Sequence, residues 1–563
     1  MNSSFDRSST RLTRREILAL GPMALAGAAV LQRRAFAQSG ETEYVEVKTK
    51  YGSLRGARDR GVAIFRGVPY GGSVSGANRF NAAPSLKPWT GVRDALQLAA
   101  PSPQPGRTGS AREPAPAEDC LFLNVWSPGP AGRKRPVMFY SHGGGFTSGS
   151  GGSAYQDGAN LARTWDVVVV ASNHRLGLMG YLYLGDLGGE EYATSGNQGM
   201  LDIRDALKWV HENIDAFGGD PDNVMIFGES GGGGKTSCLY AMPSAAPYFN
   251  KASIESGPGI RMMPRAAAVE TTLMLLKHLG LEKSDWRKLL EVPLDKLVAA
   301  QGSLSQGPGG GPLTMTGGRK GMTGGDRPGG FGPIIDGTVL PRHPFDPEAP
   351  AISKNKPLIV GYNRDETIFF LQRNAEVFNL TDATLKERLA KEFGANADTV
   401  YNTYRKNRPD ASATDLYIAI TTANMIGIGA VTIAERKYAQ RGAPVFMYIF
   451  THESEDMIPG TNHKRGAAHA LEIPYKFNLV QPASSQGGRG MMAVTGPESE
   501  KAAHNMSETW STFARTGRPA AKGQPEWPAY DDKTRATMEI NAECKVVNDP
   551  YSAERVMWER LES

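Results

Sequence analysis

Short apolar runs, rich in Val, Ile and Phe, recur along the chain with little polar alternation inside them. The clearest are PVMFY, VVVVAS, VMIF, PLIVGY and PVFMYIF, at residues 136–140, 167–172, 224–227, 357–362 and 444–450. Strands that form nearly continuous apolar runs are typical of parallel sheets covered on both faces. We therefore predict these runs as buried strands of one mostly parallel sheet.

Residues 200–217, MLDIRDALKWVHENIDAF, have the period of a helix instead. The apolar side chains that recur at steps of four and three, on one face, are those of Ile203, Leu207, Val210, Ile214 and Phe217. GGDPDN at 218–223 is expected to end this helix and lead into the next strand. The alternation of strands and helices predicts one doubly wound α/β domain, with helices on both faces of the sheet.

Residues 305–333 interrupt this pattern, because they are dense in Gly and Pro and lack periodicity. Such composition predicts a loop or insertion. A linker between two domains is the alternative. We favour an insertion, because strand-like runs continue on both sides of it.

The first 37 residues carry most of the net charge of +5, since they hold six arginines and two acids and leave +1 for the rest. The pair Arg14-Arg15 precedes an apolar run at 17–31 and the small-x-small sequence AFA at 35–37. That run is too short to span a bilayer as a helix. We predict residues 1–37 as a twin-arginine-type export signal of a bacterial protein, periplasmic or secreted, and residues 38–563 as the α/β domain.

The remaining composition excludes several classes of function. A nearly neutral body has no basic surface for nucleic acid. No other segment looks long and apolar enough to anchor the chain in a membrane. The three cysteines, Cys120, Cys238 and Cys544, match neither a zinc site nor a dense disulfide framework, and their spacing does not settle whether any two pair. His142, Asp456 and His463 fit no familiar ligand spacing either, so we expect no metal.

The stretch VMIFGESGGGGKTS, residues 224–237, contains two signatures that exclude each other. A phosphate-binding loop needs four residues between its two glycines before Lys, but five separate Gly228 from Gly234, and Glu229 would repel phosphate. A nucleophile elbow, G-x-S-x-G between a strand and a helix, fits without adjustment. We therefore interpret Ser230 as a nucleophile and expect a helix after it.

A serine nucleophile needs a base and a site for the oxyanion. YSHGGGF at 140–146 follows a predicted strand, and its consecutive glycines expose backbone N–H groups of the kind that receive an oxyanion. A tight turn without a catalytic role is the simpler interpretation. The presence of the elbow favours the oxyanion role.

Several further stretches, in this order, resemble the type B carboxylesterase family, the cholinesterase-like branch of the α/β hydrolases. They include EDCLFLNVWSP, VMFYSHGGGFTSGS, NQGMLDIRDALKWVHENIDAFGGDP, FGESGGG, GPIIDGTVLP, PLIVGYNRDET and GAAHALEIPYKF, which together span roughly residues 45 to 530. The resemblance implies the α/β-hydrolase fold, esterase activity and a small-molecule ester as substrate, with no cofactor.

Matched motif by motif, the resemblance places the nucleophile at Ser230, the acid at Glu366 and the base at His469. It places the oxyanion donors at the N–H groups of Gly144, Gly145 and Gly231. Asp365 is the rival acid, but adjacent residues leaving a strand point in different directions. Glu229 either tunes the histidine electrostatically or is simply the permitted x of the elbow.

The chain also departs from the family pattern. The segment APSPQP at 100–105 lacks the cysteine that commonly pairs with the one of EDC, so Cys120 is expected to lack that bridge. The loop GRTGSAREPAPA has no aromatic residue to hold a quaternary ammonium, which argues against choline esters. Thr367 stands where glycine is usual, and Glu255 where glutamine is common.

We predict an exported serine esterase that acts on esters of hydrophobic acids or alcohols through an acyl-enzyme. A catalytically inactive, cholinesterase-like binding protein is one alternative. A nucleotide-binding protein, suggested by GGGGK, is another. Hydrolysis of amides, carbamates or lactones would use the same residues.

Overall fold

The computed structural model describes residues 43–129, 132–305, 328–479 and 495–562. The chain divides into two units, Met1–Tyr44 and Val45–Ser563, and the features discussed below lie in the second, apart from Tyr44 at the edge of the sheet. The predicted export signal lies outside the described residues, as does most of the predicted insertion at 305–333.

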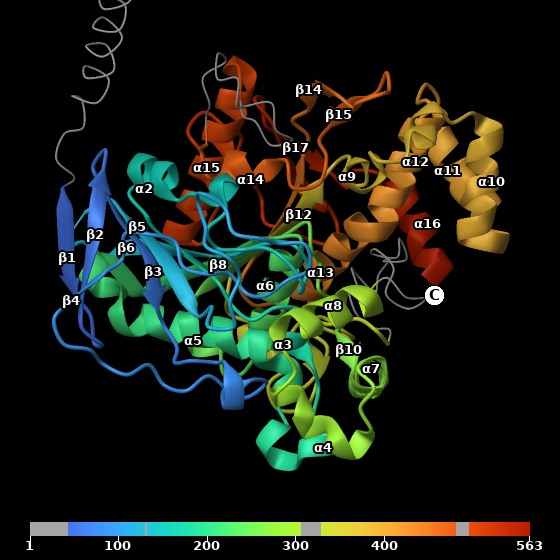
Figure 1. Ribbon diagram of the computed structural model, residues 1–563. Coiled ribbons are helices and arrows are strands. Elements are labelled where there is room, and N and C mark those ends of the chain that lie inside the picture. The colour runs from blue at the N-terminus through green and yellow to red at the C-terminus, as the bar shows by residue number, and fades with distance from the viewer. Residues whose placement is uncertain (1–42, 130–131, 306–327, 480–494, 563) are drawn as a thin grey trace, which may run out of the picture. The chain divides into compact units, whose positions relative to one another are not determined.

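One large sheet dominates the second unit (Figure 1). Its hydrogen-bonded order is β1-β2-β3-β5-β7-β6-β8-β9-β12-β13-β16-β17, and β4 pairs with β2. The strands are β1 (Tyr44–Lys48), β2 (Ser53–Asp59), β3 (Val62–Pro69), β4 (Val92–Asp94), β5 (Phe122–Ser127), β6 (Arg135–Ser141), β7 (Val168–Ser172), β8 (Gly219–Glu229), β9 (Lys251–Glu255), β12 (Leu358–Asn363), β13 (Val445–Phe450), β16 (Ala536–Ile540) and β17 (Lys545–Asn548). Two short ribbons are separate from it: β10 (Met263–Pro264) with β11 (Ile334–Ile335), and β14 (Ser454–Met457) with β15 (Lys464–Gly466).

All the predicted strands are confirmed, as β6, β7, β8, β12 and β13. From β7 to β16 every neighbouring pair is parallel. The predicted helix is α5 (Gln198–Asn213), continued by a 3-10 turn at Ile214–Phe217. The predicted break at 218–223 is too long, since β8 already begins at Gly219 and only Gly218, with φ +81°, makes the turn.

The sheet is covered on both faces, which explains why its strands are apolar throughout. Alternate residues of β6 belong to different cores: Val137 and Phe139 pack with α5, whereas Met138 and Tyr140 pack with α15 (Pro497–Thr516). The first face also carries α6 (Gly231–Ala241) and α13 (Ile428–Ala439), and the second α2 (Ala159–Trp165) and α14 (Glu472–Lys476). The predicted mostly parallel sheet with helices on both faces is confirmed.

The amino-terminal side of the sheet is antiparallel, which the sequence did not predict. β2, β3, β5 and β7 pair antiparallel in that order. β17 adds an antiparallel strand at the opposite edge.

Nine further α-helices are present in the described residues. They are α3 (Gly177–Tyr181), α4 (Gly185–Gly188), α7 (Arg265–His278), α8 (Leu294–Ser305), α9 (Ile368–Leu371), α10 (Asp382–Phe393), α11 (Ala397–Asn407), α12 (Ala413–Thr422) and α16 (Ser552–Glu562). Residues of α9 to α12 and α16 share a separate apolar cluster (Figure 1).

The expectation that no further segment is long and apolar enough to cross a membrane is wrong for the helical stretch Ala413–Ala439. This stretch joins α12, a π turn at Ala423–Gly427 and α13, and it meets that test by length and composition. However, 78% of its most apolar 18-residue stretch is buried inside the protein. Its hydrophobicity is therefore that of a core helix, which packs against β12 and β13.

Candidate active site

Ser230 lies on a strained turn between β8 and α6, as the elbow motif predicts. Its backbone has φ +58° and ψ −123°, a conformation that residues other than glycine rarely adopt. A Cβ at Gly232 would lie 2.0 Å from the Ser141 carbonyl oxygen, and one at Gly228 would lie 2.6 Å from it. Only glycine fits at either position, so the turn presses close to the end of β6 and projects Ser230 from the sheet.

His469 and Glu366 complete a continuous chain of hydrogen bonds with Ser230. The imidazole Nε2 of His469 lies 2.8 Å from Ser230 Oγ, and its Nδ1 lies 2.5 Å from Glu366 Oε2. Ser230 is partly exposed, whereas His469 is 4% exposed and Glu366 is fully buried. A histidine held in this way can take the proton of the serine hydroxyl while the carboxylate stabilises the imidazolium.

The region around Glu366 contains positioning contacts that the sequence did not reveal. The backbone N–H of Asn363 donates to Glu366 Oε1 at 2.7 Å, and the Asn363 amide donates to Glu472 and to the Ala468 carbonyl, next to the histidine. Thr367 is buried, and its hydroxyl lies 2.8 Å from that of Thr421. The strand end of β12 and the histidine loop are therefore tied together by side chains.

Asp365, the rival acid, is engaged elsewhere. Its carboxylate pairs with Arg364 at 2.8 Å and accepts the N–H of Ala467. The side chains weighed as metal ligands are also separated: His463 bonds to Asp415, and His142 stacks on His174.

Glu229 lies beside the histidine as well, with Oε1 at 3.2 Å from His469 Nε2. Burial raises the pKa of Glu229 to about 8, against the opposing pull of the histidine charge. Burial alone would lower the pKa of His469, but the carboxylates of Glu229 and Glu366 outweigh it and raise that pKa to about 9. His469 and Glu229 together therefore keep a proton to higher pH than an isolated imidazole would.

The three glycines predicted as oxyanion donors meet beside Ser230. Gly144 and Gly145 have φ of +87° and +62° and are exposed. A Cβ at Gly231 would lie 2.2–2.4 Å from the oxygen, Cα and nitrogen of Gly145, so the two backbones are in direct contact. Within the described part of the chain, none of these three N–H groups donates a hydrogen bond to the protein. They are available to a substrate oxygen.

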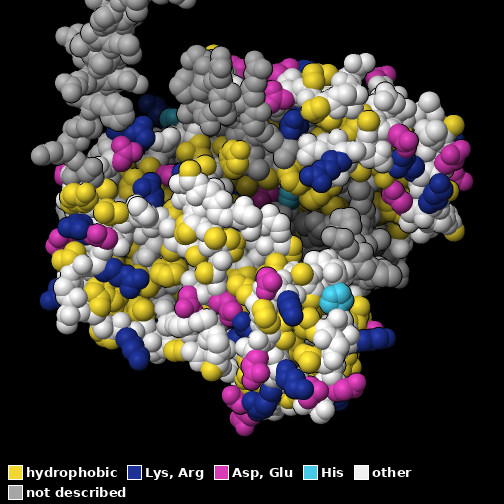
Figure 2. Space-filling model, viewed as in Figure 1, with side chains coloured by type: hydrophobic (Ala, Val, Ile, Leu, Met, Phe, Trp, Pro, Cys, Tyr) yellow, Lys and Arg dark blue, Asp and Glu magenta, His cyan; other side chains and the backbone are white. Residues whose placement is uncertain are grey.

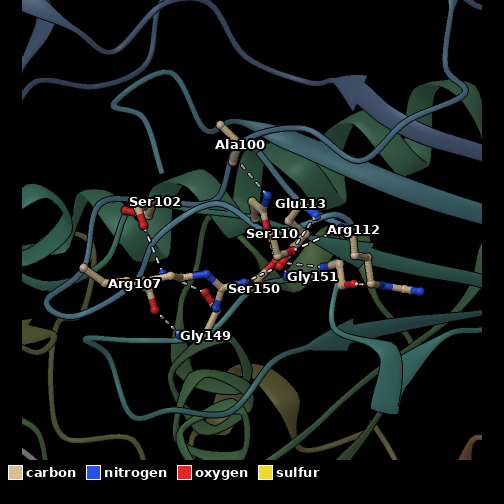
Figure 3. Close-up of polar contacts among 12 residues, drawn as sticks. Ala100, Ser102, Arg107, Ser110, Arg112, Glu113, Gly149, Ser150 and Gly151 are labelled. Atoms are coloured by element: carbon tan, nitrogen blue, oxygen red, sulfur yellow. Dashed lines mark hydrogen bonds and ion pairs between the residues drawn. The ribbon is translucent and has the colours of Figure 1, made fainter. Parts of the chain in front are cut away.

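A polar network holds the loop that would carry the family's disulfide. Cys120 and the other two cysteines are free thiols. In place of a bridge, the Glu113 carboxylate accepts from Arg107 and from the Ser150 hydroxyl (Figure 3). Gln104 accepts the N–H of Gly149 at 2.8 Å and donates to its carbonyl at 3.0 Å. This loop is thereby attached to Gly149, where the turn that begins at His142 and contains Gly143–Gly145 ends (the glycine turn).

Glu255, the departure from the usual glutamine, is compensated by a second buried charge. Its carboxylate pairs with the ammonium of Lys476, and both side chains are fully buried. Glu255 also accepts from Trp510 Nε1 at 2.6 Å, and its backbone carbonyl accepts the N–H of Ser230. Burial opposes the charge of Lys476, but Glu255 and Glu472 outweigh it and raise the lysine pKa.

Lys235, the residue that suggested a phosphate-binding loop, is fully buried on α6. Its amine donates to the His142 carbonyl at 2.9 Å. The geometry favours the elbow.

The surface in the view of Figure 2 is hollowed near its centre. Hydrophobic side chains lie along part of its rim, and a histidine and an acidic side chain are visible inside it. The half-buried rings of Phe369 and Phe370 pack on the imidazole of His469, with centroids 5.6 and 4.9 Å away. The two rings thus place apolar surface beside the base, whose nitrogens face Glu366, Glu229 and Ser230.

Comparison with known proteins agrees with this geometry. The model of the carboxylesterase family matches residues 43–558. The chain is 33% identical to the para-nitrobenzyl esterase of Bacillus subtilis, over 90% of this chain and 97% of the relative. It is 30% identical to the phenmedipham hydrolase of Pseudarthrobacter oxydans, over 88% and 94%. The crystal structure of carboxylesterase EST55 from Geobacillus stearothermophilus superposes with a TM-score of 0.77, at 35% identity, covering 91% of this chain and 99% of that one.

The fold and the relatives define a carboxylic ester hydrolase of the α/β-hydrolase class. The chain belongs to the carboxylesterase family. Its substrate is accordingly a small-molecule ester.

Proposed function

We propose that this protein hydrolyses carboxylic esters with Ser230 as nucleophile, His469 as general base and acid, and Glu366 as the carboxylate that orients the imidazole. The observation that carries the proposal is the unbroken hydrogen-bond chain from Ser230 Oγ through His469 to Glu366. The backbone N–H groups of Gly144, Gly145 and Gly231 are proposed as the oxyanion donors.

The reaction proceeds in two halves. His469 Nε2 takes the proton from Ser230 as Oγ attacks the ester carbonyl carbon, and the carbonyl oxygen becomes an oxyanion that the glycine N–H groups receive. The intermediate collapses, the alcohol leaves with the proton from His469, and an acyl group stays on Ser230. Water, deprotonated by His469, then attacks the acyl-enzyme, which releases the acid and restores the serine hydroxyl.

Esters with hydrophobic acyl or alcohol groups suit this site best. Phe369 and Phe370 place apolar surface against the base, and hydrophobic side chains border the hollow of the surface. Burial of each additional methylene contributes about 0.8 kcal/mol.

A series of p-nitrophenyl esters from acetate to palmitate tests this function. We expect kcat/KM to rise from acetate to medium chain lengths, because longer acyl groups bury more apolar surface. Matched p-nitroanilides and p-nitrophenyl carbamates test the alternative bonds. A folded protein that cleaves none of the esters would contradict the proposal and favour a binding protein.

Replacing Glu229 with glutamine is expected to move the acid limb of the kcat/KM profile to lower pH. Activity requires neutral His469 and rises as the pH passes its pKa, which the Glu229 carboxylate helps to raise. Glutamine keeps the shape of the side chain but removes its charge, so the pKa of the His469 imidazole falls and it loses its proton at lower pH. An unchanged or alkaline-shifted limb would show that Glu229 does not act on the base electrostatically.

We further propose that residues 1–37 direct export through the twin-arginine route. Support comes from Arg14-Arg15, the apolar run at 17–31 and the AFA sequence before Gln38. Replacing both arginines with lysine is expected to retain the precursor in the bacterial cytoplasm. Fractionation and amino-terminal sequencing measure this, and mature protein beginning near Gln38 outside the cytoplasm of the variant would contradict it.

A further inference from the structure

Lys235 is a buried cation without a buried anion. It lies five positions after Ser230 on α6, and its side chain is fully buried. Its amine donates to the His142 carbonyl at 2.9 Å and forms no ion pair with any carboxylate in the described residues. Burying an ammonium in this way costs several kcal/mol, which an apolar side chain of the same length would avoid. Packing alone therefore does not account for this lysine.

The partner of Lys235 is the first residue of the glycine turn. His142 directly precedes Gly143, and the exposed N–H groups of Gly144 and Gly145 follow. A run of glycines has no side chains to fix its backbone, so its conformation depends on what holds its two ends. Gln104 holds the far end through both backbone groups of Gly149, and Lys235 holds the near end.

The titratable groups next to Lys235 are two buried histidines, which offer it no counter-charge. His142 stacks on His174 with ring centroids 4.7 Å apart. Burial lowers the pKa of both imidazoles well below the usual range, and the charge of Lys235 lowers them further, with a smaller contribution from Arg107 at His142. Both histidines are therefore neutral. Burial also lowers the pKa of Lys235, to about 7.

We propose that Lys235 is a positioning residue for the oxyanion-binding turn, whose amine fixes the His142 carbonyl and so the backbone that leads to the glycine N–H groups. The inference rests on the proposed function of Ser230 and of the glycine N–H groups. The hydrogen bond fixes the peptide group between His142 and Gly143, and preorganised N–H donors around an oxyanion stabilise the transition state more than the bound ester.

Lys235→Met tests this role, because methionine has a similar length but neither charge nor donor. We expect kcat for a p-nitrophenyl ester to fall about 10- to 100-fold, less than for loss of a direct oxyanion donor, with KM nearly unchanged. The affinity for a trifluoromethyl ketone, which forms a tetrahedral adduct with the serine, should fall by the same factor as kcat/KM. The Tm should stay equal or rise, because an unpaired buried ammonium is removed.

Two further variants keep the test sharp. Lys437→Met is the matched control: Lys437 is also fully buried, and its amine donates to the backbone carbonyls of Ser353 and Lys354, away from the site. It should leave kcat and ketone affinity unchanged. Lys235→Gln, with an uncharged donor, should recover part of the lost kcat, and it provides the same readouts if the methionine variant does not fold.

The affinity for the ketone separates positioning of the oxyanion donors from simple packing. Unchanged kcat and ketone affinity in Lys235→Met, or a kcat loss with unchanged ketone affinity, would overturn the inference. Failure of a fluorophosphonate to label Ser230 in the wild type would instead overturn the proposed function on which it rests.

Discussion

Replacing Ser230 with alanine is expected to lower kcat for p-nitrophenyl esters by about a million-fold. The hydroxyl is the atom that forms the acyl-enzyme, and removal of the nucleophile from a comparable triad leaves only the catalysis due to binding and the oxyanion site. The fold should persist, because the side chain is partly exposed and, among the described residues, its hydroxyl bonds only to His469. Stopped assays with purified variant and wild type measure this loss.

Ser237→Ala is the matched control for this change. Ser237 lies on the same helix and is fully buried, and its hydroxyl donates to the Gly233 carbonyl at 2.9 Å. We expect its kcat to stay within about tenfold of wild type, since the hydroxyl supports α6 without facing the ester. A Ser230→Ala protein that keeps more than about a hundredth of wild-type kcat would place the nucleophile elsewhere.

Replacing Lys476 with methionine is expected to reduce the free energy of unfolding by about 3–5 kcal/mol. The change leaves the fully buried carboxylate of Glu255 without its counter-charge, and removing one partner of a buried ion pair has an effect of this size. Esterase activity should fall at ambient temperature as well, because the Glu255 backbone carbonyl holds the N–H of Ser230. Urea denaturation followed by tryptophan fluorescence and by activity measures both effects.

The double variant Lys476→Met with Glu255→Gln shows whether charge is the cause. It removes both charges, while the introduced glutamine retains an amide oxygen for Trp510, whose indole N–H donates to the Glu255 carboxylate at 2.6 Å in the wild type. We expect most of the lost stability to return, since neutral replacement of a buried pair is often harmless. A single variant as stable as wild type would mean that Glu255 is satisfied without Lys476.

The parts of the fold that are determined locally could be predicted from the sequence. The strands follow from continuous apolar runs and α5 from its hydrophobic period. The elbow follows from a G-x-S-x-G motif whose glycines leave no room for a Cβ. The antiparallel side of the sheet was missed because β2, SLRGARD, mixes arginine, glycine and aspartate and lacks a clear apolar run. Residues 413–439 were not recognised as a long apolar helix. Their length and composition would also suit a membrane span, and only their burial in the structure identifies them as a core helix.

Pairings between distant residues could not be predicted in the same way. Glu366 and His469 are 103 positions apart, and only the resemblance to a family proposed them together. Glu255 and Lys476 are 221 positions apart, and the sequence around each of them shows no partner for its charge. The available signal was a carboxylate in SIESG and a lysine within the otherwise apolar IPYKF. Lys235 first suggested a nucleotide site because it follows a run of glycines. Nothing in the sequence indicates that its amine donates to the His142 carbonyl.

Covalent labelling with a fluorophosphonate, followed by peptide mass spectrometry, tests the central claim most directly. Since the reagent needs a serine activated by a base, the account predicts one adduct per chain, on Ser230, formed in proportion to the loss of esterase activity. Glu366→Gln should slow labelling strongly without changing its position. Complete inhibition with Ser230 unmodified, or an adduct on another serine such as Ser256, would contradict the account.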